Sequence, residues 1–342
     1  MKRPTIIDVA VEAGVSKSTA ARAMSGAKNV SPKMRDAVTR AARDIGYQRN
    51  NIAVSMRSGR SGLLGIVVPD ISNPFWAEVV RGAQDVAGSL DSSLLIFSSD
   101  WDLSKEKRHV DALLQARVDG FLLNSVANSQ EGGFLEQPTV PFVLLGTSAD
   151  LFPDVSSVGS NIGNAVEIGL NYLKRMGHGV PALIVSSERK LARAKFVSAV
   201  QEYLIAQDFD PARLRIEECT PTADGGRSAM DRLLDDRTPE HLTVFAANDL
   251  MALGAIMCAR ERGVDCPSQV SVLGIDGIPA GEFCAPPLTT VAKPARSIGA
   301  EALSLLGRSV AGGSEAISRL RLDCELVERG SVGRLNLLRK AS

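Results

Sequence analysis

Between residues 63 and 275, short apolar runs alternate with longer segments in which apolar residues recur at helical spacing. Continuous apolar runs of this length are typical of strands that are buried on both faces. The predicted strands are 63–68, 94–98, 120–123, 142–145, 182–185, 214–217, 242–246 and 270–275. The predicted helices are 74–87, 104–116, 162–176, 192–206, 226–234 and 250–262, with a further amphipathic helix at 296–310. This number of strands is too many for one sheet, so the pattern predicts two Rossmann-like α/β lobes of parallel strands, with a ligand at the strands' carboxyl ends.

Residues 5–26 follow a different pattern, which predicts two short helices joined by a tight turn. Thr5 and Ser16 are favourable N-caps, and Gly14 between them tolerates the positive φ that ends the first helix. A third helix is predicted to begin at Ser31-Pro32 and to end at Gly46. This arrangement predicts an all-α helix-turn-helix headpiece, whose second helix lies in the major groove of DNA. A small helical hairpin without any DNA contact is the alternative.

Charge is divided unevenly between these two parts of the chain. Residues 1–60 hold twelve basic and four acidic side chains, which gives this segment a net charge of +8. The remaining residues hold 27 basic and 35 acidic side chains, which gives a net charge of −8 and a neutral chain. The division indicates that only the first segment contacts a polyanion such as DNA.

Several classes of function find no support in the sequence. The five cysteines form no Cys-x-x-Cys pair, so neither a disulfide framework nor a zinc site is predicted. No apolar segment of a secretory signal follows Lys2-Arg3, and no run of eighteen apolar residues occurs, which predicts a cytoplasmic protein without a membrane span. The Gly-x-Gly-x-x-Gly and Gly-x-x-x-x-Gly-Lys motifs are missing, so no nucleotide cofactor is predicted. No nucleophile, base and orienting group form a catalytic set, so we do not expect an enzyme.

Polar side chains follow several predicted strands at the points where the strands end. These segments are 70–75, 99–101, 248–249 and Asp276. Carboxylates and carboxamides bind hydroxyl groups, and Phe75 and Trp101 could stack on the apolar face of a sugar. The segments therefore predict a polyol or sugar site in a cleft between the lobes. The alternative is that Asn73, Asn248 and Asp276 only cap helices and turns.

The first segment resembles the headpiece of the lactose-repressor (LacI/GalR) family of bacterial transcription regulators. The resemblance rests on Asp8-Val9-Ala10, Ala13-Gly14-Val15-Ser16, Thr19 and Arg22, and it extends through Asn73-Pro74-Phe75, Gly177-His178, Asn248-Asp249, Gly274-Ile275-Asp276 and Pro287-Leu288-Thr289-Thr290-Val291. It implies a body similar to a periplasmic solute-binding protein, in which the chain crosses between two lobes three times. The implied domains are a headpiece at 1–48, a hinge helix or linker at 49–61, an effector-binding and dimerisation domain at 62–330 and a C-terminal tail at 331–342. Within the body, the N-lobe is expected at about 62–160 and 291–318, and the C-lobe at about 161–290 and 319–330.

For DNA, the resemblance implies contacts from the helix-turn-helix and from the hinge, where an apolar side chain opens a base step in the minor groove. Lys17, Ser18 and Arg22 are expected to read bases, and Met56 takes the place of the family's hinge leucine. Ala21 departs from the family's serine, which shifts the expected phosphate contacts toward Lys17 and Lys33. The expected DNA-contacting residues are Thr5, Ser16, Lys17, Ser18, Thr19, Arg22, Asn29, Lys33, Asn50, Ala53 and Met56.

For the effector, the resemblance implies a site between the lobes. The expected residues are Asn73, Phe75, Asp100, Arg189, Arg193, Asn248 and Asp276. The family often places an arginine four residues before an aromatic side chain, but here Ala192 holds that position relative to Phe196. Arg189 or Arg193 could substitute for it, and an arginine in this place would favour an anionic group on the ligand.

Together these features predict a homodimeric repressor that binds a near-palindromic operator in double-stranded DNA and responds to a carbohydrate or sugar acid. An effector-responsive activator and a solute-binding transport protein with the same body are the alternatives. A sugar-modifying enzyme of this architecture would need the catalytic set that is missing. The tail at 331–342 is too short for a heptad repeat, which favours a dimer over a tetramer.

Overall fold

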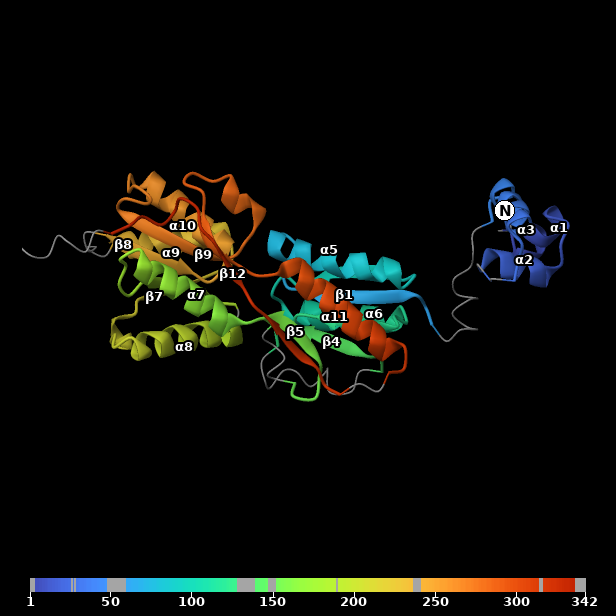
Figure 1. The fold of residues 1–342 in the computed structure, drawn as a ribbon, viewed down its shortest axis with the longest axis horizontal. Coiled ribbons are helices and arrows are strands. Elements are labelled where there is room, and N and C mark those ends of the chain that lie inside the picture. The colour runs from blue at the N-terminus through green and yellow to red at the C-terminus, as the bar shows by residue number, and fades with distance from the viewer. Residues whose placement is uncertain are drawn as a thin grey trace, which may run out of the picture. The chain divides into compact units, whose positions relative to one another are not determined.

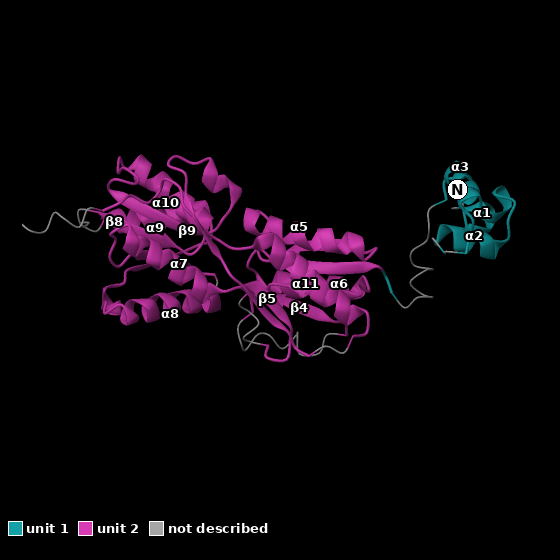
Figure 2. Cartoon of the chain, in the orientation of Figure 1, with its two compact units in different colours: residues 1–61 teal, residues 62–342 magenta. Residues whose placement is uncertain are grey.

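The computed structural model describes residues 4–25, 27, 29–47, 60–127, 139–146, 152–188, 190–235, 241–313 and 316–335. The chain forms two compact units, Met1–Ser61 and Gly62–Ser342 (Figure 2). Among the described helices, none has the length and apolar character that a bilayer span requires.

The first unit is a three-helix domain of α1 (Ile6–Glu12), α2 (Lys17–Met24) and α3 (Pro32–Asp44). The predicted caps at Ser16 and Ser31 are confirmed, because their hydroxyls accept hydrogen bonds from the backbone N–H of the third residue of α2 and of α3, respectively. The carboxylate of Asp8 accepts hydrogen bonds from the backbone N–H and the hydroxyl of Thr5. The three helices enclose a small core of Val9, Ala10, Ala20, Ala23, Val30, Val38 and Ala42.

The second unit contains two six-stranded sheets. The first sheet has the order β11-β5-β4-β3-β1-β2 and is parallel throughout; its strands are β1 (Leu63–Val68), β2 (Ser93–Ser98), β3 (Gly120–Leu123), β4 (Phe142–Leu145), β5 (Ser157–Ser160) and β11 (Arg319–Leu322). The second sheet has the order β12-β10-β9-β8-β6-β7, with strands β6 (Ala182–Ser186), β7 (Ile216–Cys219), β8 (Leu242–Ala246), β9 (Val270–Asp276), β10 (Thr289–Ala292) and β12 (Glu325–Val327). Only the β10–β12 pair among these is antiparallel. The two predicted α/β lobes are thus confirmed.

Helices cover both sheets (Figure 1). With the first sheet they are α5 (Pro74–Ser89), α6 (Leu103–Gln115) and α11 (Ala295–Val310), and we call this assembly the first lobe. With the second sheet they are α7 (Ile162–Arg175), α8 (Lys190–Ala206), α9 (Ala223–Asp235) and α10 (Asp249–Glu261), and this assembly is the second lobe. Short 3₁₀ turns occur at Pro211–Arg213 and Pro279–Glu282.

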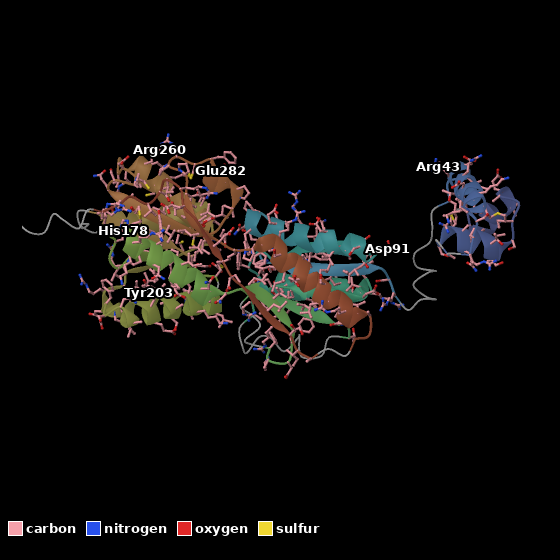
Figure 3. All side chains as sticks on the ribbon, viewed as in Figure 1. Arg43, Asp91, His178, Tyr203, Arg260 and Glu282 are labelled. Atoms are coloured by element: carbon pink, nitrogen blue, oxygen red, sulfur yellow. The ribbon has the colours of Figure 1, made fainter. Side chains whose placement is uncertain are left out.

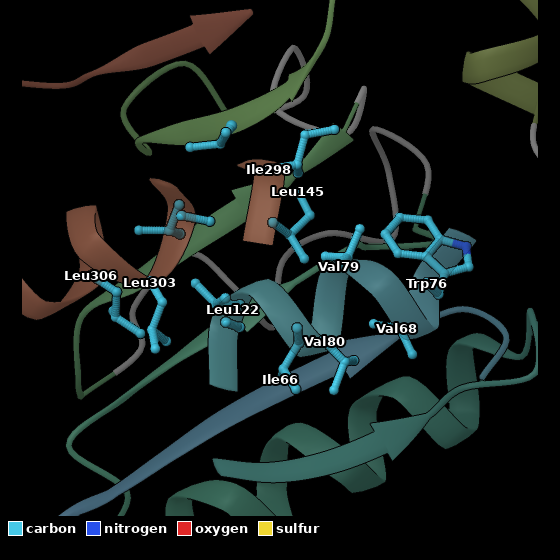
Figure 4. Close-up of a cluster of buried hydrophobic side chains, with 14 of the residues drawn as sticks. Ile66, Val68, Trp76, Val79, Val80, Leu122, Leu145, Ile298, Leu303 and Leu306 are labelled. Carbon is cyan, nitrogen blue, oxygen red and sulfur yellow. The ribbon is translucent and has the colours of Figure 1, made fainter. Parts of the chain in front are cut away.

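The core of the first lobe shows why α5 and α11 pack together on one face of the sheet. Figure 4 shows side chains of both helices, including Val79 and Leu303, converging on the strand residues Ile66, Leu122 and Leu145. The helices approach closely at two glycines, since a Cβ at Gly82 would overlap the carbonyl oxygen of Arg296 and a Cβ at Gly299 would overlap that of Val79.

The lobe boundaries differ from the predicted ones at the second and third crossings. β11 pairs with β5, so residues 319–322 belong to the first lobe and not to the second. β10 pairs with β9, so residues 291–292 stay in the second lobe. β11 alternates exposed arginines with half-buried leucines and therefore shows no continuous apolar run.

The predicted boundary of the tail is also wrong, because residues 331–335 are part of the second lobe. Ser331 is fully buried, and its hydroxyl donates a 2.6 Å hydrogen bond to the carbonyl of Val272. His178, labelled in Figure 3, donates from Nε2 to the carbonyl of Gly333 over 2.8 Å. Residues 336–342 lie outside the described residues.

Candidate functional site

A cavity in the second unit opens where strands of both sheets end. Its walls come from both lobes, as the topology of parallel strands predicts. The lining residues are Asn73, Phe75, Trp76, Trp101, Gly146, Gly159, Ser160, Ile162, Ser186, Ala192, Arg193, Phe196, Pro221, Ala247, Asn248, Met251, Asp276, Lys293 and Ile298. Five of the seven residues predicted for the effector are among them. The two others are Asp100, which does not line the cavity, and Arg189, which lies outside the described residues.

The polar centre of the cavity is an ion pair between Asp276 and Lys293. Lys293 Nζ lies 2.8 Å from Asp276 Oδ1, and the two side chains are only 12% and 5% exposed, respectively. The ammonium also lies 5.2 Å from the centre of the Phe75 ring, within the range of a cation–π contact. Lys293 follows β10 directly, where the chain crosses from the second lobe to the first.

Lys293 is not among the predicted effector residues, although the sequence around it contains a usable pattern. Residues 289–292 were not predicted as a strand, because the run of Thr-Thr-Val-Ala is short and half polar. Recognised as a strand, it would have placed Lys293 at the same sheet edge as Asp276.

The turn that carries Asp276 is held by a second, deeper carboxylate. Asp249 is fully buried at the start of α10 and accepts 2.8 Å hydrogen bonds from the backbone N–H groups of Gly277 and Ile278. It also accepts a 2.6 Å hydrogen bond from the hydroxyl of Thr290. Burial, and next the neighbouring carboxylate of Asp276, raise the pKa of Asp249 to about 7. Asp276 itself has a positive φ of 135°, a backbone conformation that these contacts stabilise.

Aromatic side chains of the first lobe form an apolar wall. Phe75 and Trp76 stand edge to face with ring centres 5.0 Å apart. Trp101 joins them from a turn in which Asp100 and Trp101 both have positive φ, closed by a 2.9 Å hydrogen bond from the N–H of Asp102 to the carbonyl of Ser99.

The prediction that Asp100 faces the cleft is wrong. Its carboxylate instead accepts 2.8 Å hydrogen bonds from Lys105 Nζ and from the hydroxyl of Ser98. These bonds, that of Lys105 foremost, lower the pKa of Asp100. The turn directs the neighbouring indole of Trp101 to the cavity in its place.

The two predicted asparagines are helix caps as well as cavity residues. Asn73 accepts a 3.0 Å hydrogen bond from the N–H of Phe75, and Asn248 accepts one of 2.7 Å from that of Met251. The amide nitrogen of Asn248 donates to the carbonyl of Pro221 over 3.1 Å. The capping interpretation is therefore correct for both. Each amide can offer the cavity only the donors and acceptors that these hydrogen bonds do not use.

The cavity's second cation comes from α8. Arg193 lines the cavity and forms an ion pair with Glu218 of β7, which is not a lining residue. The guanidinium side chain is 24% exposed, and its partner is 51% exposed. Ala192, where an arginine is frequent in the resembled family, lines the cavity as a small apolar residue.

In the first unit, α2 presents a polar face. Lys17, Ser18 and Arg22 are exposed, whereas Ala20 and Ala23 are buried against the other helices. Thr19 is half-buried, and its hydroxyl lies 2.9 Å from that of Ser16. Of the other residues predicted to contact DNA, Thr5, Asn29 and Lys33 are exposed, and Asn50, Ala53 and Met56 lie outside the described residues.

Two family models match the chain. The model described as bacterial regulatory proteins, lacI family, matches residues 5–50, and the model of the periplasmic binding protein-like domain matches residues 170–332. The HTH-type transcriptional regulator DegA of Bacillus subtilis is 30% identical over 338 residues, covering 98% of this chain and 99% of the relative. The HTH-type transcriptional repressor CytR of Escherichia coli is 30% identical over 341 residues, covering 96% of each.

Solved structures of similar proteins agree with the fold. The lac repressor dimer bound to operator and the anti-inducer ONPF has a TM-score of 0.84 and 25% identity, over 97% of this chain and all of that one. The complex of the transcriptional regulator CelR with cellobiose has a TM-score of 0.72 and 29% identity, over 96% of this chain and all of that one.

Proposed function

Because the chain belongs to the LacI family of bacterial regulatory proteins, we propose that it is a transcriptional repressor whose affinity for operator DNA is set by a small molecule in the cavity between its lobes. The observation that carries this proposal is the combination of a helix-turn-helix unit with a cavity walled by both lobes of one body. The protein is a regulator and not an enzyme. DegA and CytR, which align with it over nearly their whole length, are transcriptional regulators too.

The DNA-binding step rests on the exposed face of α2. Lys17, Ser18 and Arg22 project from the first two turns, the part of a recognition helix that reaches base edges. The excess of basic residues in 1–60 supplies the phosphate contacts that hold a protein on the duplex. We place the protein in the cytoplasm as a homodimer, like the lac repressor dimer on operator, with two headpieces about 34 Å apart on a near-palindromic site.

The regulatory step rests on the cavity. Hydroxyl-binding groups, above all Asp276 and Lys293, line the same cavity as the aromatic side chains of Phe75, Trp76 and Trp101, a combination suited to a sugar or sugar derivative. The CelR–cellobiose complex, in which a similar protein holds a sugar, supports this ligand class. A ligand that contacts both lobes favours one lobe arrangement over another and thereby changes operator affinity.

The test is a DNA-binding assay with the full chain. Selection from duplexes with a randomised core, at about 0.15 M salt, should enrich one near-palindromic sequence, which fluorescence anisotropy then compares with a scrambled duplex. Arg22→Ala should weaken binding to the selected site by about tenfold or more, and far less to the scrambled duplex, because a base contact carries the preference. Arg43→Ala, in the last turn of α3, is the control with the same charge change. Equal affinity for selected and scrambled duplex would refute the proposal.

A further inference from the structure

The charges that line the cavity are not balanced within it. Among the described lining residues, the charged ones are Asp276, Lys293 and Arg193. Asp276 and Lys293 neutralise each other in a nearly buried pair, so this part of the wall presents no net charge. Arg193 therefore leaves the cavity wall with one positive charge in excess.

The partner of Arg193 is placed outside the cavity. Glu218 is half-exposed on β7, whereas three-quarters of the Arg193 side chain is buried. An ion pair with so exposed a carboxylate contributes little free energy, because water and salt screen it. A ligand carboxylate inside the cavity meets the same guanidinium with less competition from water, and arginine has donors for two such partners.

The ion pair of Asp276 and Lys293 is suited to hydroxyl groups. Lys293 donates one of its three N–H groups to Asp276 Oδ1, which leaves two donors beside the carboxylate's other oxygen, to which none of the described residues donates a hydrogen bond. A hydroxyl donates to a carboxylate and accepts from an ammonium at once, so a polyol satisfies both without separating the pair. The cation–π contact with Phe75 restrains the ammonium in this position.

We infer, on the basis of the proposed function, that the effector is a monoanionic polyhydroxy compound, a sugar acid. Its carboxylate binds Arg193 of the second lobe, its hydroxyls bind Asp276 and Lys293, and an apolar face lies against Trp101. Arg193 and Trp101 thus engage one ligand from α8 of the second lobe and from a turn of the first. A neutral sugar would form hydrogen bonds with Asp276 and Lys293, but Glu218 would remain the only carboxylate paired with Arg193 among the described residues.

The chain supplies its own probe for the test. Both of its tryptophans, Trp76 and Trp101, line the cavity, so intrinsic fluorescence reports a ligand there. Each ligand is added to full-length protein up to about 10 mM, well above a weak effector's dissociation constant. The ligands are pairs of a neutral compound and an acid: glucose and glucuronate, galactose and galacturonate, and sorbitol and gluconate. At least one acid should bind about tenfold tighter than its neutral counterpart.

Three variants locate the preference. Arg193→Gln should lower the affinity for that acid about tenfold and the affinity for the neutral counterpart far less, because the charged contact to the carboxylate is the larger loss. Glu218→Gln should raise the affinity for the acid, since the competing carboxylate is removed. Arg227→Gln breaks an exposed pair with Glu261 in the same lobe, away from the cavity, and should change neither affinity.

The outcomes separate this inference from the proposed function. Tighter binding of neutral sugars than of their acids, or failure of every acid to bind, overturns the inference while repression by a neutral ligand stands. An acid preference that survives Arg193→Gln overturns the assignment to Arg193. Loss of the proposed function would instead appear as an absence of DNA selectivity, which none of these titrations measures.

Discussion

At the scale of single residues, the cavity depends on two carboxylates with different roles. Asp276 faces the ligand space beside Lys293, whereas Asp249 lies behind it and holds the turn through two backbone N–H groups. Substitutions at the two positions should therefore have separable effects, one on ligand affinity and one on stability.

Asp276→Asn should weaken effector binding by about tenfold or more, because a hydrogen bond to a charged group is lost and Lys293 is left without its counter-ion. Operator binding without effector should stay within about twofold of wild type, since the first unit is untouched. Tryptophan fluorescence measures the first quantity and anisotropy the second. Asp235→Asn, in an exposed pair with Arg262, is the matched control, and an unchanged effector affinity in Asp276→Asn would contradict the site.

Asp249 should make stability depend on pH. Its pKa of about 7 in the folded protein exceeds the ordinary value of 3.8, so between these values the folded state binds more protons than the unfolded state. This group's contribution to the free energy of unfolding therefore decreases as pH rises through that window. Asp249→Asn removes the titration and can still accept from Gly277 and Ile278 while donating to Thr290.

Relative to wild type, Asp249→Asn should be more stable at pH 8 than at pH 5, by about 1–3 kcal/mol. Thermal unfolding midpoints of both proteins at the two pH values give this difference. If the stability difference between Asp249→Asn and wild type is the same at pH 5 and at pH 8, the carboxylate of Asp249 is ionised at both pH values.

At the scale of elements, the pattern of apolar runs predicted the buried central strands and most helices well, with β1, β3, β4 and β8 at their observed bounds. It missed β5, β10, β11 and β12, whose residues are small, polar or half-exposed. It also placed one edge strand two residues early, at 214–217, where β7 spans Ile216–Cys219. Strands at or near a sheet edge owe their pairing to backbone hydrogen bonds and neighbouring loops, which hydrophobic periodicity does not encode.

The missed strands also explain why one site residue could not be predicted from the sequence. Residues that follow the predicted strands, such as Asn248 and Asp276, were placed at the cavity correctly, whereas Lys293 follows a missed strand. Trp101, and not Asp100, lines the cavity because both residues have a positive φ. No side-chain pattern predicts two successive positive φ values.

The contact between α5 and α11 gives a prediction at this scale. Gly82→Ala should destabilise the protein by about 1–3 kcal/mol, because its Cβ would overlap the carbonyl oxygen of Arg296 and force the helices apart. Gly88→Ala in the same helix is the control, since a Cβ there has no neighbour within 4 Å. It should be neutral or slightly stabilising, because alanine favours helix. Equal unfolding midpoints of the two variants would contradict the close crossing.

At the scale of the whole molecule, one chain combines a unit suited to a duplex with a unit suited to a metabolite, and regulation requires that the two binding free energies be linked. Linkage is reciprocal: if the effector changes operator affinity by a factor of about 5–150, saturating operator must change effector affinity by the same factor. Tryptophan titrations of the effector with and without operator measure one side, and anisotropy with and without effector measures the other. Arg22→Ala should weaken operator binding in both effector states and leave the factor unchanged, because none of the residues that line the cavity comes from α2. If operator leaves effector affinity unaltered while the effector alters operator affinity, the ligand that controls DNA binding is not the one in the cavity.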